Sequence, residues 1–134
     1  NSESNCISIS RFLWGALEGY DERFDLDGGG LINLDFYKRA CEFPSAQHII
    51  LFGEGTFHQL HGGVTTGGQD ESARAMYIEA SNRQYCRLRG ADYVSPRTNP
   101  LFLGNYSPQI QRFVKYSAEM AIKLEGKDSL GKPH

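Results

Sequence analysis

The densest group of residues that can do chemistry lies between Gly53 and Gly63. These eleven residues include four glycines, and their reactive side chains are those of Glu54, Thr56, His58 and His61. An imidazole can ligate a divalent metal or move a proton near neutral pH. His58 and His61 would share a face only on a helix, so we expect a single histidine ligand rather than a closed two-histidine site. The alternative is that both rings are hydrogen-bonded near the edge of the core.

A second group is the run Gly28-Gly29-Gly30, directly before a helical pattern that starts at Leu31. Glycines let the backbone approach a ligand closely, and the free N–H groups at a helix start favour an anion such as a phosphate. The run matches neither a dinucleotide-binding fingerprint nor a Walker loop. A tight turn that needs positive φ angles is the competing interpretation.

Two carboxylates, Asp25 and Asp27, precede the glycines on one side of an extended segment. Carboxylate oxygens are the ligands that Mg²⁺ or Mn²⁺ prefers, although Asp-x-Asp is also common in turns before glycine. No pattern for a serine or cysteine nucleophile is present around any Ser or Cys.

The elements expected to position these groups are mainly helices. We expect a short helix over Ser10–Glu18 closed by Gly19, and a second from Leu31 to a stop at Pro44. Its apolar face is expected to consist of Leu31, Leu34, Tyr37 and Cys41. A bounded apolar run at His48–Phe52 predicts a buried strand.

The second half of the chain predicts two longer helices. Asp70 can cap a helix that ends at Gly90, with one side made of Ala73, Met76, Tyr77, Ala80 and Gln84. An extended segment follows over Ala91–Tyr106. Ser107 and Pro108 then start an amphipathic helix that ends at Gly126, with Ser107 as side-chain cap. Its packing stripe is Ile110, Phe113, Val114, Ser117, Ala118, Ala121 and Ile122.

Composition limits the class of protein. The chain has 134 residues, of which 40% are hydrophobic and 22% are charged, as is usual for a globular protein. We expect one α/β domain over residues 1–126, rich in helix and with a short sheet, followed by a polar tail at residues 127–134. A net charge of −2 argues against a nucleic-acid partner. Arg83, Arg87 and Arg89 are expected to complement a helix dipole, and recognition of a phosphate is the alternative. The sequence shows no membrane span and no signal peptide. The three cysteines form no CxxC pair, so buried free thiols and a cytoplasmic location are expected.

Several of these segments together resemble a known family. The segments are Gly19-Tyr20-Asp21-Glu22-Arg23-Phe24, the acidic and glycine run to Gly30, the strand Ile49–Phe52, and Phe57-His58 with His61-Gly62-Gly63. They are similar to the acceptor-side, C-terminal half of family 2 glycosyltransferases, which have the GT-A fold. The resemblance has motif character over Leu17–Gly63. Leu103–Pro108 and the helix containing Ser117–Glu119 resemble the ends of such chains more loosely.

The resemblance implies transfer of a sugar from a nucleotide-diphosphate sugar to an acceptor, with a weakly bound Mg²⁺ or Mn²⁺. It implies metal ligation by His58 or His61 together with Asp25. It places substrate at Gly28, Gly29, Gly30, Thr56, Gly62 and Gly63. The family's general base is an acidic residue in the loop before the helix. Because glycines occupy that loop here, Asp27 or Glu54 is expected to take the role.

The nucleotide-binding half of such enzymes has no counterpart in these residues. The resemblance therefore implies that the chain pairs with a missing N-terminal half or self-associates. Two other classes stay open: a non-catalytic module that binds a small anion or a partner peptide, and a metal-dependent hydrolase that uses Asp25, Asp27, His58 and His61. Because both segments are rich in glycine and both belong to the resemblance, we expect Gly28–Gly30 and Gly53–Gly63 to form one cleft.

Overall fold

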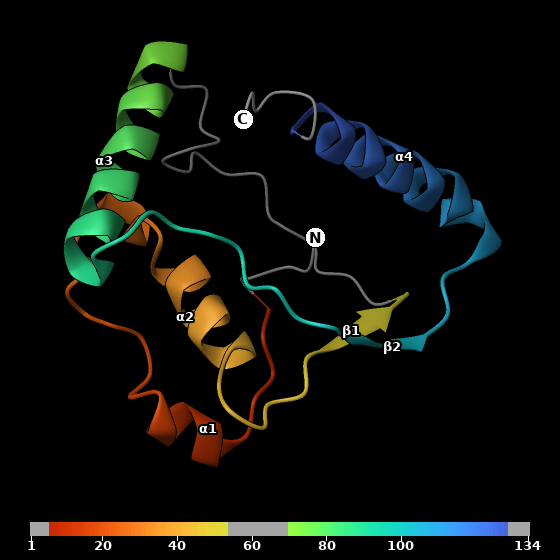
Figure 1. Cartoon of the computed structure of the whole chain (residues 1–134), viewed down its shortest axis with the longest axis horizontal. Coiled ribbons are helices and arrows are strands. Elements are labelled where there is room, and N and C mark those ends of the chain that lie inside the picture. The colour runs from red at the N-terminus through yellow and green to blue at the C-terminus, as the bar shows by residue number, and fades with distance from the viewer. Residues whose placement is uncertain (1–5, 54–69, 129–134) are drawn as a thin grey trace, which may run out of the picture. The chain divides into compact units, whose positions relative to one another are not determined.

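Helices make up most of the regular structure (Figure 1). The structure, a computed structural model, describes residues 6–53 and 70–128, apart from the side chains of residue 121 and of residues 124–128. In chain order the elements are α1 (Arg11–Ala16), the 3-10 turn η1 (Asp27–Gly29), α2 (Ile32–Cys41), β1 (Ile49–Phe52), α3 (Glu71–Arg89), β2 (Leu101–Gly104), the 3-10 turn η2 (Pro108–Ile110) and α4 (Gln111–Asp128). The two strands pair as a parallel sheet. The prediction of a small, helix-rich α/β chain is confirmed at this level.

The contacts within the chain divide it into two compact units. The first unit contains Asn1–Ile50 and Thr56–Leu101, and the second contains Leu51–Gly55 and Phe102–His134. A single domain over residues 1–126 stays a prediction. Among the described residues, no helix is both long and apolar enough to cross a membrane.

The starts of α1 and α3 and the end of α3 follow from their capping residues. The Ser10 hydroxyl accepts a hydrogen bond from the Leu13 N–H at the start of α1. The Asp70 carboxylate does the same for Ser72 at the start of α3, and Gly90 ends that helix in the left-handed conformation. These three predicted boundaries are confirmed.

The core of the first unit is small and aromatic. Its buried apolar side chains are Phe24, Phe36, Ala40 and Tyr85. The Phe36 ring contacts the rings of Trp14 and Tyr20, with centroids 5.1 and 4.7 Å away. The core therefore joins α1, α2, α3 and the segment between α1 and α2.

Two predicted helix faces are wrong in detail. On α2 the buried residues are Asp35, Phe36 and Ala40, whereas the predicted face of Leu31, Leu34, Tyr37 and Cys41 is only half-buried. On α3 the buried residues are Ser81, Gln84 and Tyr85, and Met76 is exposed. Hydrophobic periodicity misses Asp35 because ion pairs hold this charged residue inside. On α3 the predicted face includes the buried Gln84 but not Ser81 or Tyr85.

The cysteines also differ from expectation. All three are free, as predicted, but only Cys41 is partly buried, and Cys6 and Cys86 are exposed. Burial raises the pKa of the Cys41 thiol, against the opposing effect of a hydrogen bond with Tyr37. Cys86 lies on α3 beside the buried Tyr85, but its own side chain faces outward.

The second unit contains α4 and most of the strand pair. The Phe52 ring stacks on Phe102 with centroids 4.9 Å apart, and Tyr106 packs edge-on against Phe52. β1 alternates between exposed and half-buried residues, so the expectation of a fully buried strand is wrong. Ile49 and Leu51 keep outward-facing side chains because a two-stranded sheet provides little cover.

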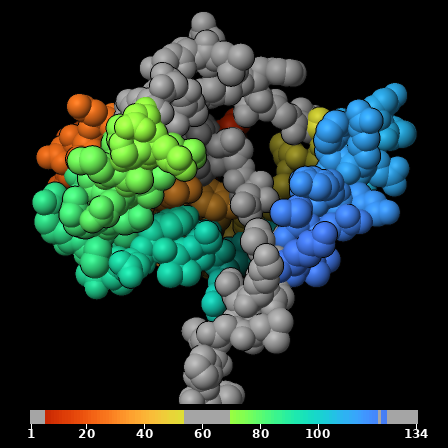
Figure 2. All heavy atoms as spheres, turned by 90° about the horizontal axis from the view of Figure 1, so that it is seen from above, coloured from red at the N-terminus to blue at the C-terminus, as the bar shows by residue number. Residues whose placement is uncertain are grey.

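The helix α4 differs from its prediction at both ends. Ser107 makes no side-chain capping bond, and Pro108 opens a 3-10 turn before the α-helix begins. The helix also continues through Gly126 to Asp128. Along the helix, drawn in blue in Figure 2, Phe113 and Ile122 of the predicted packing stripe are 57% and 69% exposed.

Candidate functional site

A buried carboxylate organises the first unit. The Asp35 side chain, in the first turn of α2, is only 1% exposed. Arg39 lies one turn later on the same helix, and its Nε donates to Asp35 Oδ2 at 2.8 Å. Arg89, in the last turn of α3, donates through Nε to Oδ1 at 2.6 Å and through a terminal nitrogen to Oδ2 at 2.8 Å. Asp35 therefore ties α3 to α2 through a two-point contact.

Arg39 also holds the segment that follows α1. Its two terminal nitrogens donate to the carbonyl oxygens of Leu17 at 2.7 Å and Gly19 at 2.9 Å. Carbonyls past the end of a helix have no partner within the helix, so an arginine is well suited to satisfy them. The start of the Gly19–Phe24 pattern is thus fixed by α2.

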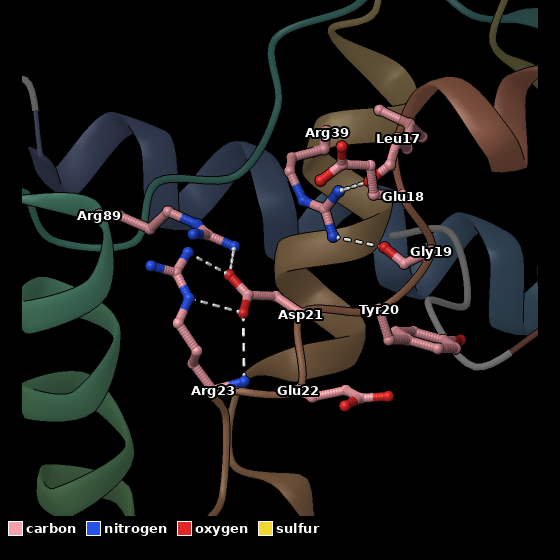
Figure 3. A pocket seen from close by; sticks show the side chains of 9 residues that line it. All are labelled: Leu17, Glu18, Gly19, Tyr20, Asp21, Glu22, Arg23, Arg39 and Arg89. Carbon is pink, nitrogen blue, oxygen red and sulfur yellow. Dashed lines mark hydrogen bonds and ion pairs between the residues drawn. The ribbon is translucent and has the colours of Figure 1, made fainter.

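A second carboxylate, Asp21, extends the cluster (Figure 3). Arg23 binds it at two points, with Nε 2.9 Å from Oδ1 and a terminal nitrogen 2.7 Å from Oδ2. A terminal nitrogen of Arg89 lies 2.8 Å from the same Oδ2. The result is a chain of five ionised groups, Arg23–Asp21–Arg89–Asp35–Arg39, with three positive and two negative charges.

The proton affinities of these groups follow from the same contacts. The hydrogen bond from Arg23 is the largest cause of the lowered pKa of Asp21, and a hydrogen bond from Arg89 adds to it. Burial alone would raise the pKa of Asp35, but the hydrogen bonds from Arg89 and Arg39 outweigh it and lower the pKa. The bond to Asp35 likewise raises the pKa of Arg89. Both carboxylates are therefore ionised at neutral pH.

An open pocket of about 560 Å³ lies over this cluster (Figure 3). Most of its lining is polar and hydrogen-bonding, and it consists of Leu17, Glu18, Gly19, Tyr20, Asp21, Glu22, Arg23, Arg39 and Arg89. The lining thus contains Gly19–Arg23, the first five residues of the Gly-Tyr-Asp-Glu-x-Phe pattern. The sixth, Phe24, is buried in the core.

The glycine run beyond Phe24 is held by α3. Gly28, Gly29 and Gly30 all have positive φ, so the tight-turn interpretation is correct for their backbone. The Tyr77 hydroxyl accepts from the Gly30 N–H at 3.1 Å and donates to the Asp27 carbonyl oxygen at 2.7 Å. One tyrosine therefore bridges the turn that leads into α2.

Gln84 supports the same turn from one side. Its Nε2 donates to Asp25 Oδ1, and its Oε1 is buried without a hydrogen-bond partner. A Cβ placed on Gly30 would lie 3.2 Å from that Oε1, so the glycine allows the close approach of α3. Since Asp25 requires a donor, the orientation of the amide is fixed.

The two predicted acidic residues, Asp25 and Asp27, have different surroundings in the structure. Asp25 is bonded to Gln84, whereas the exposed Asp27 carboxylate makes no hydrogen bond or ion pair among the described residues. Within the same part of the chain, no group of three or more His, Cys, Asp or Glu side chains is arranged to hold a metal ion. The remaining predicted site residues, Glu54, Thr56, His58, His61, Gly62 and Gly63, lie outside the described residues, so the shared cleft with Gly28–Gly30 stays a prediction.

Sequence reasoning missed the cluster around Asp35. The available signal was the spacing of Asp35 and Arg39, four residues apart on a predicted helix. Arg89 lies in the last turn of α3, as expected for a residue that complements the helix dipole, but its ion pairs with Asp35 and Asp21 were not foreseen.

Comparisons of the chain with protein-family models, with curated proteins and with solved structures gave no match in any of the three.

Proposed function

We propose that the chain is the acceptor-side part of a glycosyltransferase and that the pocket over Asp21 receives the acceptor. The observation that supports this most is that the same residues carry the resemblance and line the pocket. The Gly19–Arg23 segment, which carries the resemblance to family 2 glycosyltransferases, also forms a large part of the pocket wall.

The chemistry of the pocket suits a sugar. Each sugar hydroxyl can both donate and accept a hydrogen bond. The pocket offers carboxylate acceptors on Asp21 and Glu22 and guanidinium donors on Arg23 and Arg89. Pockets for drug-like ligands are mostly apolar, in contrast to this one.

The general base of this proposal is Asp27. Its carboxylate is exposed, while its backbone is held in place by Tyr77. A carboxylate that is not neutralised by a cation can accept the proton of an attacking hydroxyl. Glu54 is the alternative base.

The proposed Mg²⁺ or Mn²⁺ would be held by Asp25 and one of His58 and His61, and it would neutralise the diphosphate of the donor. The described residues fit this only in part, because Gln84 already binds one Asp25 oxygen. Asp25 therefore offers one oxygen, and most of the coordination would come from water and from the donor.

The test is transfer between a panel of nucleotide-diphosphate sugars and a panel of acceptor sugars, with Mn²⁺ present. Release of the nucleoside diphosphate is measured. Asp27→Asn should lower the rate about 100-fold or more, the usual contribution of a general base. Asp70→Asn is the matched control, because Asn caps a helix as well as Asp.

Sugar binding is followed in parallel through the backbone NMR signals of Gly19–Arg23. If no sugar perturbs these signals and no donor is consumed, the proposal is wrong. Turnover that is unchanged in Asp27→Asn would instead remove Asp27 from the mechanism.

A further inference from the structure

The three arginines of the cluster are not equally engaged. Arg39 uses Nε and both terminal nitrogens in hydrogen bonds to Asp35, Leu17 and Gly19. Arg23 and Arg89 each use Nε and only one terminal nitrogen among the described residues. Each of these two therefore keeps one terminal nitrogen, with two N–H donors, available.

The two incompletely used guanidinium groups meet at one place. Both bind Oδ2 of Asp21, and both line the pocket (Figure 3). The Arg23 side chain is 65% exposed, so it can adjust to a ligand without disturbing the core. Arg89, by contrast, is fixed through its contacts with Asp35.

Within the ion-paired cluster itself, the charges do not cancel. The five-group cluster has three guanidinium groups and two carboxylates, which leaves one positive charge. Glu22 also lines the pocket, so the charges of the lining as a whole cancel, but its side chain points away from Arg23 and Arg89 in Figure 3. Glu18 also lines the pocket, but it forms no ion pair with the cluster among the described residues.

We infer that the pocket binds an oxyanion, a carboxylate or a phosphate, between the free N–H groups of Arg23 and Arg89. Planar guanidinium groups bind such oxygens at two points, and the extra negative charge would neutralise the cluster. This inference rests on the proposed function and makes the acceptor acidic: a sugar that carries a carboxylate or a phosphate group.

The experiment is a titration of the full chain at low ionic strength, followed by calorimetry and by the NMR signals of Gly19–Arg23. The probes are inorganic phosphate, glucuronate and, as the neutral counterpart, glucose. Arg23→Gln should weaken anion binding about tenfold, the effect of losing one charge-assisted hydrogen bond. Arg74→Gln is the matched control. Arg74 is exposed on the same helix as Arg89, fifteen residues and about 22 Å away along the axis, so its loss should change the affinity less than twofold.

A second variant gives a result of opposite sign. Asp21→Asn removes the internal competitor for both guanidinium groups, so phosphate or glucuronate should bind about tenfold more tightly. If that variant does not fold, Arg23→Gln carries the test, because the exposed Arg23 is not needed for the core.

If phosphate binds and glucuronate does not, the acceptor carries a phosphate group. If glucuronate binds, the acceptor carries a carboxylate. The inference is overturned if neither anion binds, or if Arg23→Gln and Arg74→Gln behave alike. The two proposals fail separately. Sugar transfer to neutral acceptors without anion binding refutes only the oxyanion, and anion binding without turnover refutes only the transferase.

Discussion

At the scale of single residues, Asp35 shows how a buried charge is kept. Removing a carboxylate from water is unfavourable, and a single ion pair often fails to compensate for it. Here two guanidinium groups supply three hydrogen bonds to the two oxygens, and one of those groups also satisfies the Leu17 and Gly19 carbonyls. The cluster therefore stabilises the buried charge of Asp35 and also holds the Leu17 and Gly19 part of the pocket wall in place.

Asp35→Asn tests that role. The amide keeps the shape but leaves Arg39 and Arg89 facing each other without their shared anion. We expect the free energy of unfolding to fall by about 3–5 kcal/mol, the usual cost of breaking a buried ion pair. Urea unfolding measures it. Glu79→Gln is the control, because it removes an ion pair whose side chains are 71% and 66% exposed and should cost less than about 1 kcal/mol. Equal small losses in both variants would mean that Asp35 adds no more than a surface pair.

The same carboxylates predict how stability depends on pH. Asp21 and Asp35 have pKa values below the usual 3.8 in the folded chain, so between the folded and unfolded values the unfolded chain binds more protons. Their contribution is complete above about pH 5 and is lost as the pH falls through the folded pKa values. Urea midpoints measured from pH 7 down to pH 3 should decrease, and the decrease should be shallower in Asp35→Asn. A wild-type stability that is flat over that range would contradict the assignment.

At the scale of elements, the sequence predicts what is local. Ser10, Asp70 and Gly90 mark helix ends because each meets a backbone requirement within its own turn. The buried face of α2 was missed because Asp35 is held inside by Arg89, 54 residues away in the chain. On α3, Gln84 was placed on the correct side, but its partner Asp25, 59 residues away, was not foreseen. Such pairings leave no periodic signal in one sequence. The glycine run was located correctly, but the tyrosine that holds it, Tyr77, was assigned only to a packing face.

Tyr77→Phe tests the bridge between α3 and the glycine turn. The substitution removes two hydrogen bonds and leaves the Gly30 N–H and the Asp27 carbonyl without their partner. Amide hydrogen exchange at Gly30 should become at least about tenfold faster, while the free energy of unfolding falls by only about 1–2 kcal/mol. Tyr116→Phe, on the exposed side of α4, is the control and should change neither. An unchanged exchange rate at Gly30 would show that the glycine turn is stable without the hydrogen bonds of Tyr77.

At the largest scale, the second unit exposes many large apolar side chains. The exposed large side chains of the second unit are Leu51, Phe102, Leu103, Tyr106, Ile110, Phe113, Tyr116, Met120 and Ile122. Their strands read as continuous apolar runs, which is typical of parallel strands covered on both faces. At about 25 cal/mol per Å², a few hundred Å² of such surface corresponds to several kcal/mol, comparable with the whole stability of a small domain.

This surface predicts self-association of the isolated chain. Sedimentation velocity over a range of concentrations should show a monomer that gives way to a dimer or larger species, since water-exposed apolar patches of this size favour contact. The double variant Phe113→Ser, Ile122→Ser should shift the association to at least tenfold higher concentration, because both side chains are more than half exposed and lie on α4. Arg112→Ser with Lys115→Ser is the control, since it changes the same helix but leaves the apolar residues in place. A monodisperse monomer at every concentration would mean that the second unit is covered within the chain itself. In that case the non-catalytic binding module becomes the stronger candidate, because a self-contained chain has no need of a missing donor half.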